Sequence, residues 1–305
     1  MPRLHLELVR RADSAEEFAR LARGWLTEAR TELFPELSRR LPDAAVLKRP
    51  VPDPRVPIGP PDATFAGIAI YPEASVLRGT RSLVYSPRAF ERTLSGLASD
   101  YPYMVSFSMM PLSPAGRRFD PEPSVSFEVR REPSDPVWVR FMVDAPEDLI
   151  AWSGSAETQM EWVRFLERWA ARLDACYGHL TDDANDSGTA LEMVTQMPGI
   201  DPPTVPRCRE VLRGYSWVTI CAPELVRRLG GVAALAASGA FAEVRELPGG
   251  QVLLQATPLL DQYQGTAVER VFQVLAPVLL PGRVTQEFVG GHARLVVGAD
   301  AADFQ

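Results

Sequence analysis

The chain has 305 residues, of which 46% are hydrophobic, enough to bury a sizeable core and to exclude disorder along the whole length. Its 39 acidic and 32 basic residues give a net charge of −7, which argues against a general nucleic-acid binder because phosphate contacts need a basic surface. The three cysteines are an odd number without paired short spacing, which argues against a disulfide framework or a structural zinc site.

The hydropathy pattern argues against a membrane protein. No apolar run approaches the roughly 18 residues that a membrane-spanning helix needs. Charged residues interrupt the apolar ones in Met1–Glu7, so the start of the sequence lacks the apolar core of a signal peptide. We therefore expect a cytoplasmic protein.

Residues 1–62 form the first predicted region, a strand and a helix followed by a connector. Ser14 is a typical helix N-cap with two glutamates after it, and apolar residues recur at helical spacing from Phe18 to Leu33. Seven prolines between Pro42 and Pro61 exclude a regular helix or a central strand there. This stretch is expected to be a long extended connection.

Residues 63–196 are predicted to form a first α+β half. Apolar alternation predicts strands near residues 65–70, 83–85 and 103–108, with a helix beginning near Ser86-Pro87. Residues 125–129 and 137–143 alternate with period two around a turn sequence, which predicts a hairpin. The pattern from Glu157 to Leu173 predicts an amphipathic helix.

Residues 207–305 are predicted to form a second half, after a proline-rich break at Met197–Pro206. A strand at residues 217–221 leads into a helix opened by Pro223 and closed by Gly230-Gly231. A hairpin is predicted around Gly249-Gly250, then another helix and a final hairpin around Gly290-Gly291. The expected fold class is α+β, with an antiparallel sheet and helices packed on one face.

The two halves share short segments of similar sequence. Ser82–Arg92 and Trp217–Arg227 both predict a strand, a proline and a helix, and Phe127–Pro133 is similar to Ala242–Pro248. An ancient duplication of a strand-helix-strand-strand-helix unit explains both matches, and chance similarity explains them equally well.

The run from Arg213 to Pro281 carries a family resemblance. Its Trp217 strand, Pro223 helix, Gly249-Gly250 hairpin and Leu253–Ala256 strand resemble a family of bacterial immunity proteins associated with polymorphic toxins, including effectors of type VI secretion. The similarity extends back to about Ala63. The resemblance implies a non-enzymatic protein that binds a cognate toxin in the cytoplasm and occludes its active site, and it leaves the toxin's identity open.

Candidate chemical motifs are weak. Cys176 and His179 have a Cys-x-x-His spacing, followed by Asp182 and Asp183, which could bind a metal, although a helix end at Gly178 explains the same residues. Ser216 has the first half of a nucleophile elbow without its closing glycine, which favours an ordinary strand residue. We therefore expect no catalytic residue, no metal and no cofactor.

The tryptophans allow two interpretations. They could line a ligand pocket, but their helical and strand spacing is more typical of core residues, most clearly for Trp162 and Trp169. The tryptophans considered are Trp138, Trp152, Trp162, Trp169 and Trp217.

The segment Leu180–Glu192 is polar and acidic. From the residues alone, a solvated connector between packed elements is the better explanation. If the resemblance holds, the segment could instead contact a basic groove of the toxin, because complementary charge speeds encounter. The candidate partner contacts are Asp182, Asp183, Asp186 and Glu192.

Two other function classes stay open beside an immunity protein. One is a small-molecule enzyme or ligand-binding protein of unknown chemistry, which needs no linear motif. The other is a structural or regulatory partner protein, which stable self-association would favour. Self-association of an immunity protein is also left open.

Overall fold

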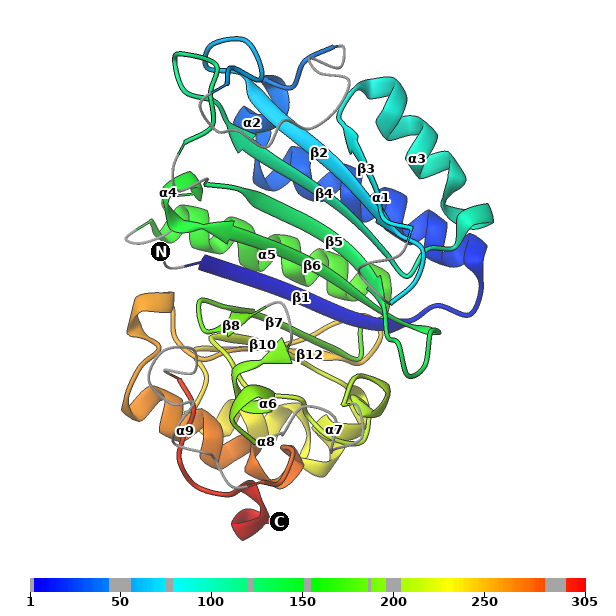
Figure 1. Cartoon of the computed structure of the whole chain (residues 1–305). Helices are drawn as coiled ribbons and strands as arrows, with labels where there is room; N and C mark the ends of the chain where they lie inside the picture. The colour runs from blue at the N-terminus through cyan, green and yellow to red at the C-terminus, as the bar shows by residue number, and fades with distance from the viewer. Residues whose placement is uncertain are drawn as a thin grey trace. The chain divides into compact units, whose positions relative to one another are not determined.

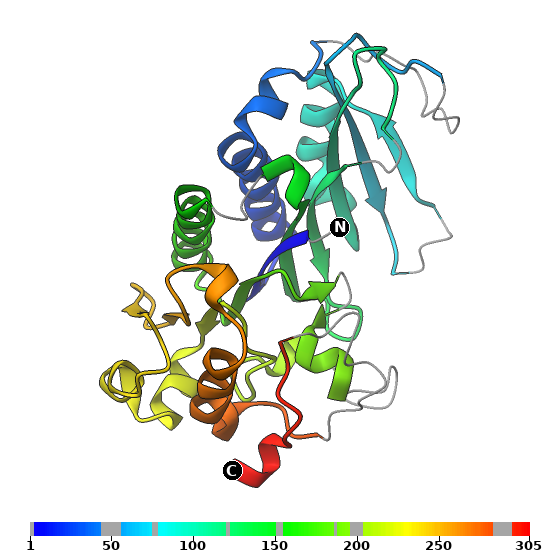
Figure 2. The ribbon, with the colours of Figure 1, turned by 90° about the vertical axis from the view of Figure 1, so that its left-hand side faces the viewer.

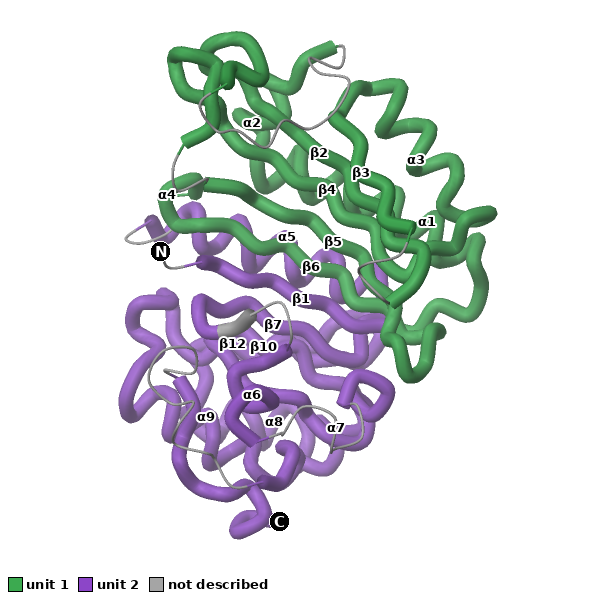
Figure 3. The backbone as a smooth tube through the Cα atoms, in the orientation of Figure 1, with its two compact units in different colours: residues 1, 11–150 green, residues 2–10, 151–305 purple. Residues whose placement is uncertain are grey.

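The protein divides into two compact units. The computed structural model describes residues 3–43, 56–74, 79–119, 123–150, 155–185, 188–195, 204–282 and 295–305. Unit 1 comprises residues 1 and 11–150, and unit 2 comprises residues 2–10 and 151–305 (Figure 3). The predicted division into 1–62, 63–196 and 207–305 stays a prediction; by compactness, residues 2–10 group with residues 151–305.

Unit 1 is built on an antiparallel sheet with the strand order β6-β5-β4-β2-β3 (Figure 1). Its strands are β2 (Thr64–Tyr71), β3 (Arg81–Val84), β4 (Met104–Pro111), β5 (Val125–Arg131) and β6 (Trp138–Pro146). Its helices are α1 (Ala15–Leu33), α2 (Pro35–Arg39), α3 (Pro87–Asp100) and α4 (Glu147–Ile150). The predicted hairpin is confirmed as β5 paired with β6.

Helix α1 forms where the sequence predicts it. The Ser14 hydroxyl accepts a hydrogen bond from the Glu17 amide at 3.1 Å, which caps the first turn. The indole Nε1 of Trp25 donates to the carbonyl of Met142 at 3.2 Å, which ties the helix to β6. The buried side of α1 consists of Phe18, Leu21, Ala22, Trp25, Leu26 and Ala29.

Unit 2 has a second antiparallel arrangement, in the order β11-β12-β10-β7-β1. Its strands are β1 (Arg3–Arg11), β7 (Tyr177–Thr181), β10 (Val218–Cys221), β11 (Glu243–Glu246) and β12 (Val252–Gln255). The last residue of β1, Arg11, is assigned to unit 1. Its helices are α5 (Ala156–Leu173), α6 (Ala190–Thr195), α7 (Pro223–Arg228), α8 (Gly231–Ala237) and α9 (Thr266–Leu275). A small ladder pairs β8 (Ala184–Asn185) with β9 (Gly188–Thr189). Short 3₁₀ turns occur at Val205–Arg207, Leu260–Gln262, Ala276–Val278 and Ala301–Phe304.

The two faces of this second arrangement differ. The β1–β7–β10–β12 register places Leu6, Leu180 and Val218 on one face, which α5 covers. The same register places Glu7 and His179 on the opposite face, where α6 lies (Figure 2). Unit 2 therefore has an apolar face under α5 and a polar one towards α6.

Several sequence expectations are confirmed. The α+β class with antiparallel sheet holds in both units. The predicted helix at residues 157–173 is α5, and the predicted Gly249-Gly250 hairpin joins β11 to β12. The predicted final hairpin around Gly290-Gly291 and most of the Pro42–Pro61 tract lie outside the described residues.

Other expectations are corrected. The segment at Gly178 is not a helix end but part of strand β7. A Cβ there would lie 2.5 Å from the Leu8 side chain and 3.0 Å from the Glu7 carbonyl oxygen, so glycine suits the close approach of β1 and β7. Cys176 and Cys208 form a disulfide, contrary to the expectation from cysteine spacing. The helix after Pro223 is two helices, α7 and α8, because Gly230 and Gly231 take positive φ angles of 86°.

The proposed duplication stays a prediction. Among the described strands, β3 lies at the end of its sheet, whereas β10 lies between β7 and β12. The two matching segments, Ser82–Arg92 and Trp217–Arg227, therefore contribute strands at different sheet positions. None of the described helices combines the length and the apolar character that crossing a membrane requires.

Candidate functional site

Buried polar side chains gather in unit 2 where β1 and β7 pair. Glu7 on β1 lies directly opposite His179 on β7, and His5 is two residues before Glu7 on the same strand. Alternate residues of a strand share a face, as do cross-strand partners, so all three side chains point the same way. Their exposed fractions are 2% for His5 and 0% for Glu7 and His179.

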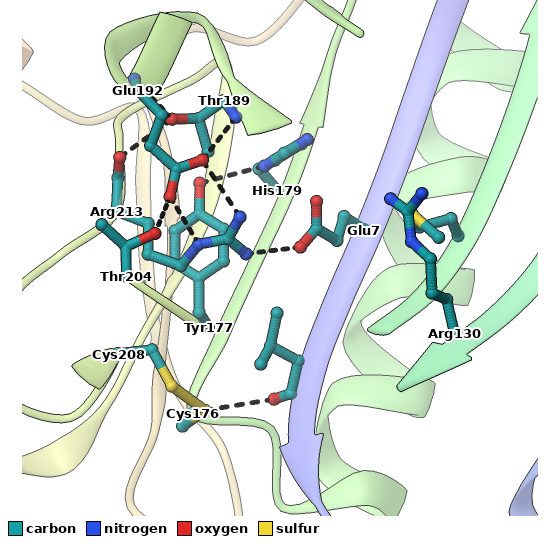
Figure 4. A network of polar contacts seen from close by, with 12 residues as sticks. Glu7, Arg130, Cys176, Tyr177, His179, Thr189, Glu192, Thr204, Cys208 and Arg213 are labelled. Carbon is teal, nitrogen blue, oxygen red and sulfur yellow. Dashed lines mark hydrogen bonds and ion pairs between the residues drawn. A yellow bond between two sulfur atoms is a disulfide. The ribbon is translucent and has the colours of Figure 1, made fainter. Parts of the chain in front are cut away.

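Arg213 connects this strand pair to helix α6. Its Nη1 donates to Glu7 Oε1, while Nε and Nη2 donate to the two carboxylate oxygens of Glu192 at 2.8 and 3.0 Å (Figure 4). The guanidinium carbon lies 5.0 Å from the ring centroid of Tyr177. Arg213 is therefore held by two carboxylates and one aromatic ring, with 1% of its surface exposed.

The charge of Arg213 is stabilised by its partners. Burial alone would lower its pKa, but the Coulombic attraction of Glu192 and then of Glu7 outweighs this effect and raises the pKa above its ordinary value. Arg213 therefore stays protonated at every pH at which the protein is folded. A buried charge of this kind stabilises the fold only while its partners are in place.

Glu192 also organises the start of α6. Its carboxylate accepts from the Thr189 amide at 2.7 Å and from the Thr204 hydroxyl, while the Glu192 amide donates to Thr189 Oγ1 at 3.1 Å. The Thr189 hydroxyl in turn donates to the Arg213 carbonyl at 2.9 Å. This reciprocal capping box links α6, the Thr204 segment and Arg213 into one network.

Two of the four predicted partner contacts belong to buried networks. Asp183 and Glu192 expose only 5% and 8% of their surfaces, so they form no exposed acidic surface, and their role as partner contacts stays a prediction. Asp183 Oδ2 accepts a hydrogen bond from the Leu295 amide at 2.6 Å, and Glu192 is engaged by Arg213. Asp182 is partly exposed, and Asp186 lies outside the described residues.

The residues of the weak Cys-x-x-His motif take separate structural roles. Cys176 is bonded to Cys208 across 6.0 Å between Cα atoms and has no thiolate to offer. His179 instead joins His5 and Glu7, and among the described residues the ligand atoms of these three lie within 4.8 Å of one another.

Tyr177 borders this cluster, and two further tyrosines of unit 2, Tyr215 and Tyr263, are buried. The Tyr177 hydroxyl lies 2.9 Å from His179 Nδ1, and the Tyr215 hydroxyl accepts from the Val297 amide at 2.7 Å. Burial raises the pKa of Tyr215 and Tyr263 well above the ordinary value, and the negative charge of Asp183 adds to the increase. Both phenols therefore stay neutral at physiological pH.

Ser216 and the free cysteine Cys221 take structural positions. The Ser216 amide donates to Thr219 Oγ1 at 3.1 Å just before β10. Burial, with a contribution from Glu224, raises the pKa of the Cys221 thiol to about 12, so the thiol is neutral and a poor nucleophile. Trp162, Trp169 and Trp217 are buried, which confirms their interpretation as core residues, and Trp152 lies outside the described residues.

Comparison with known proteins supports the fold. No protein-family model and no curated protein sequence matches the chain. The chain is similar in fold to a solved structure. It is similar to the solved structure of the Pseudomonas aeruginosa T6SS protein PA0821, with a TM-score of 0.56, 13% sequence identity, and coverage of 99% of this chain and 81% of that chain. At that identity the likeness shows the fold alone.

Sequence reasoning missed the centre of the polar network. Arg213 is 206 residues from Glu7 and 21 from Glu192, so no local pattern pairs them. A signal was present at the start of the chain, where His5 and Glu7 alternate with Leu4, Leu6 and Leu8. Such alternation marks a strand with one polar face, but only the structure shows that this face is buried.

Proposed function

We propose that this protein acts in type VI secretion as an immunity protein, which binds a toxin and neutralises it by occluding its active site. The observation that carries the proposal is a fold likeness to a T6SS protein that covers 99% of this chain. The residue pattern of the region from Ala63 to Pro281, which resembles immunity proteins of polymorphic toxins, supports it independently.

The chemistry of unit 2 suits a binding protein better than an enzyme. The Cys221 thiol is buried and neutral, and the Arg213, Glu7 and Glu192 charges engage one another. Such a network holds segments of the fold in place, and a rigid surface binds a partner at lower entropic cost. We therefore propose a non-enzymatic mode of action.

The disulfide bears on where the protein acts. Disulfides persist in oxidising compartments and are rare in the cytoplasm. The Cys176–Cys208 bond therefore favours the periplasm over the cytoplasmic location that the sequence suggested. In this proposal the protein meets its toxin in the periplasm.

A protection assay tests the function. The full chain is produced in a susceptible bacterium, in an exported and a cytoplasmic form, together with each type VI toxin encoded near its gene in the native host. We expect the exported form to restore growth against one toxin and to form a stable complex with it. Failure of both forms to protect against any of these toxins, with both proteins folded and present, contradicts the proposal.

Asp182, which is partly exposed, is the residue of the acidic segment that we propose contacts the toxin. Substitution Asp182→Lys should slow association with the toxin by about 3- to 10-fold at low salt, because rim charges act mainly on the association rate. The matched control is Asp261→Lys, which changes an exposed aspartate elsewhere in unit 2. If association kinetics and their salt dependence are unchanged in Asp182→Lys, the acidic contact is contradicted, whereas the immunity role is not.

A further inference from the structure

We propose that His5, Glu7 and His179 form a binding site for a divalent transition-metal cation such as Zn²⁺. Two imidazoles and one carboxylate are a ligand set that Zn²⁺, Fe²⁺ and Co²⁺ accept in proteins. The site lies entirely within unit 2 and does not depend on the proposed toxin binding.

The strand register supplies the geometry. Glu7 and His179 face each other across the antiparallel β1–β7 pair, and His5 is the next residue of β1 on the same face. The ligand atoms lie within 4.8 Å of one another, and His5 Nε2 is 4.0 Å from Glu7 Oε2. Ligands of a tetrahedral zinc ion are separated by roughly 3.4 Å, so side-chain shifts of about 1 Å close the site.

Two neighbouring side chains already orient the ligands. Arg213 binds Glu7 through Oε1, while Oε2 is the oxygen towards His5. The Tyr177 hydroxyl lies 2.9 Å from His179 Nδ1, so a hydrogen bond there fixes the ring orientation, and Nε2 is the coordinating atom in the proposed site (Figure 4). Metal-binding histidines and carboxylates commonly have such outer partners, which hold the ligands in position and tune their affinity.

Burial sets the expected behaviour of the ion. The three ligands expose 2% or less of their surfaces, so exchange with solvent requires local opening of the strand pair. We expect the ion to load during folding and to leave slowly in the presence of chelators. Binding to the folded state raises stability because the unfolded chain holds no formed site.

The test uses the untagged full chain, refolded with EDTA and then with Zn²⁺ or Co²⁺. We expect one ion per chain by native mass spectrometry, a melting temperature raised on the order of 5 °C, and the visible absorption of tetrahedral Co²⁺. His5→Gln and His179→Gln should each weaken binding at least about 100-fold, and Tyr177→Phe about 10-fold or more. Glu246→Gln, which alters an exposed carboxylate of the same unit, is the control and should bind normally.

The results distinguish a metal-binding site from a buried polar cluster that binds no metal. Stoichiometric binding that both histidine variants lose and the control keeps supports the site. Absence of binding, or binding that the histidine variants retain, overturns it. If a histidine variant does not fold, X-ray absorption of the wild-type zinc complex decides: outer-shell scattering from two imidazoles supports the site, and its absence overturns it.

Discussion

The two units differ in the side chains that their sheets bury, because unit 2 has a buried polar face in addition to its apolar face under α5. In unit 1, helices α1 and α3 cover aromatic residues: the Phe90 and Phe107 ring centroids lie 5.2 Å apart, and those of Trp25 and Phe141 lie 5.7 Å apart. In unit 2, one face of the β1–β7 pair carries Glu7 and its buried partners.

This difference changes how the sequence determines the packing of each unit. An apolar face accepts many side chains of suitable volume, so the pattern of hydrophobic residues is enough to define it. A buried ion pair stabilises the fold only if every partner is present, and removal of one partner leaves an uncompensated charge. The polar face of unit 2 therefore depends on a few residues that are far apart in the sequence, whereas the apolar packing of unit 1 depends on many interchangeable ones.

The largest expected effect is that of removing Arg213. Substitution Arg213→Ala should lower the free energy of unfolding by about 3–5 kcal/mol, because it leaves Glu7 and Glu192 buried without their shared cation. Chemical denaturation measures the loss, and hydrogen exchange should show weakened protection in β1 and β7.

A matched substitution gives the control for Arg213. Arg245 also bridges two carboxylates, Glu167 and Glu243, but its side chain is 45% exposed. Arg245→Ala should cost at most about 1 kcal/mol, since water screens exposed ion pairs. Equal losses in the two arginine variants would contradict the distinction between the buried and exposed networks.

The disulfide is expected to have the next largest effect. Substitution Cys208→Ser should lower stability by about 2–4 kcal/mol, because the bond closes a loop between residues 32 positions apart. Reductant should destabilise the wild type and leave Cys208→Ser unchanged. Thiol titration of the unfolded chain should find only Cys221 before reduction and three cysteines after it; three thiols before reduction would contradict the bond.

An aromatic substitution in unit 1 should have a smaller effect. Phe107→Leu keeps the site apolar, so the expected loss is about 1–3 kcal/mol from imperfect packing against Phe90 and Phe127. Hydrogen exchange should show the weakened protection in β4 and β5, while β1 and β7 keep theirs. A loss of stability as large as that of Arg213→Ala would contradict the proposed difference between the units.

The smallest effect concerns alkaline pH and Cys221. The pKa of the Cys221 thiol rises from 9.0 to about 12 on folding. The stability that the protonated thiol contributes is therefore fully present below pH 9 and is lost as the pH rises towards 12. The thiol deprotonates at a lower pH in the unfolded chain, which lowers the free energy of unfolding by up to about 1.4 kcal/mol per pH unit. The stability advantage of wild type over Cys221→Ala should therefore shrink between pH 9 and 11; a constant difference contradicts the raised pKa.

The comparison of the units also explains what the sequence could predict. Helix α1 follows from the Ser14 cap and apolar spacing, and the β5–β6 hairpin follows from period-two alternation, because both signals are local. Strand β7 was missed because Gly178 is typical of a helix end, although here it permits the close approach of β1.

The polar network could not be predicted because its partners are set by the tertiary fold. Glu192 stands in an acidic segment and suggested a surface contact, but Arg213 draws it into the interior. Cys176 and Cys208 have no short spacing, and they meet only because β7 and the Val205–Arg207 turn lie together. Charged residues on strand β1 were visible in the sequence, while their burial was not.

The most direct test of the proposed function is affinity capture of the full chain from lysate of its native host. Partners are identified by mass spectrometry while the salt concentration of the wash is varied. We expect one stoichiometric partner, encoded beside type VI secretion genes, that survives the wash and whose toxicity the protein suppresses. Recovery of the protein alone, from cells in which the candidate toxin is expressed, would contradict the immunity role.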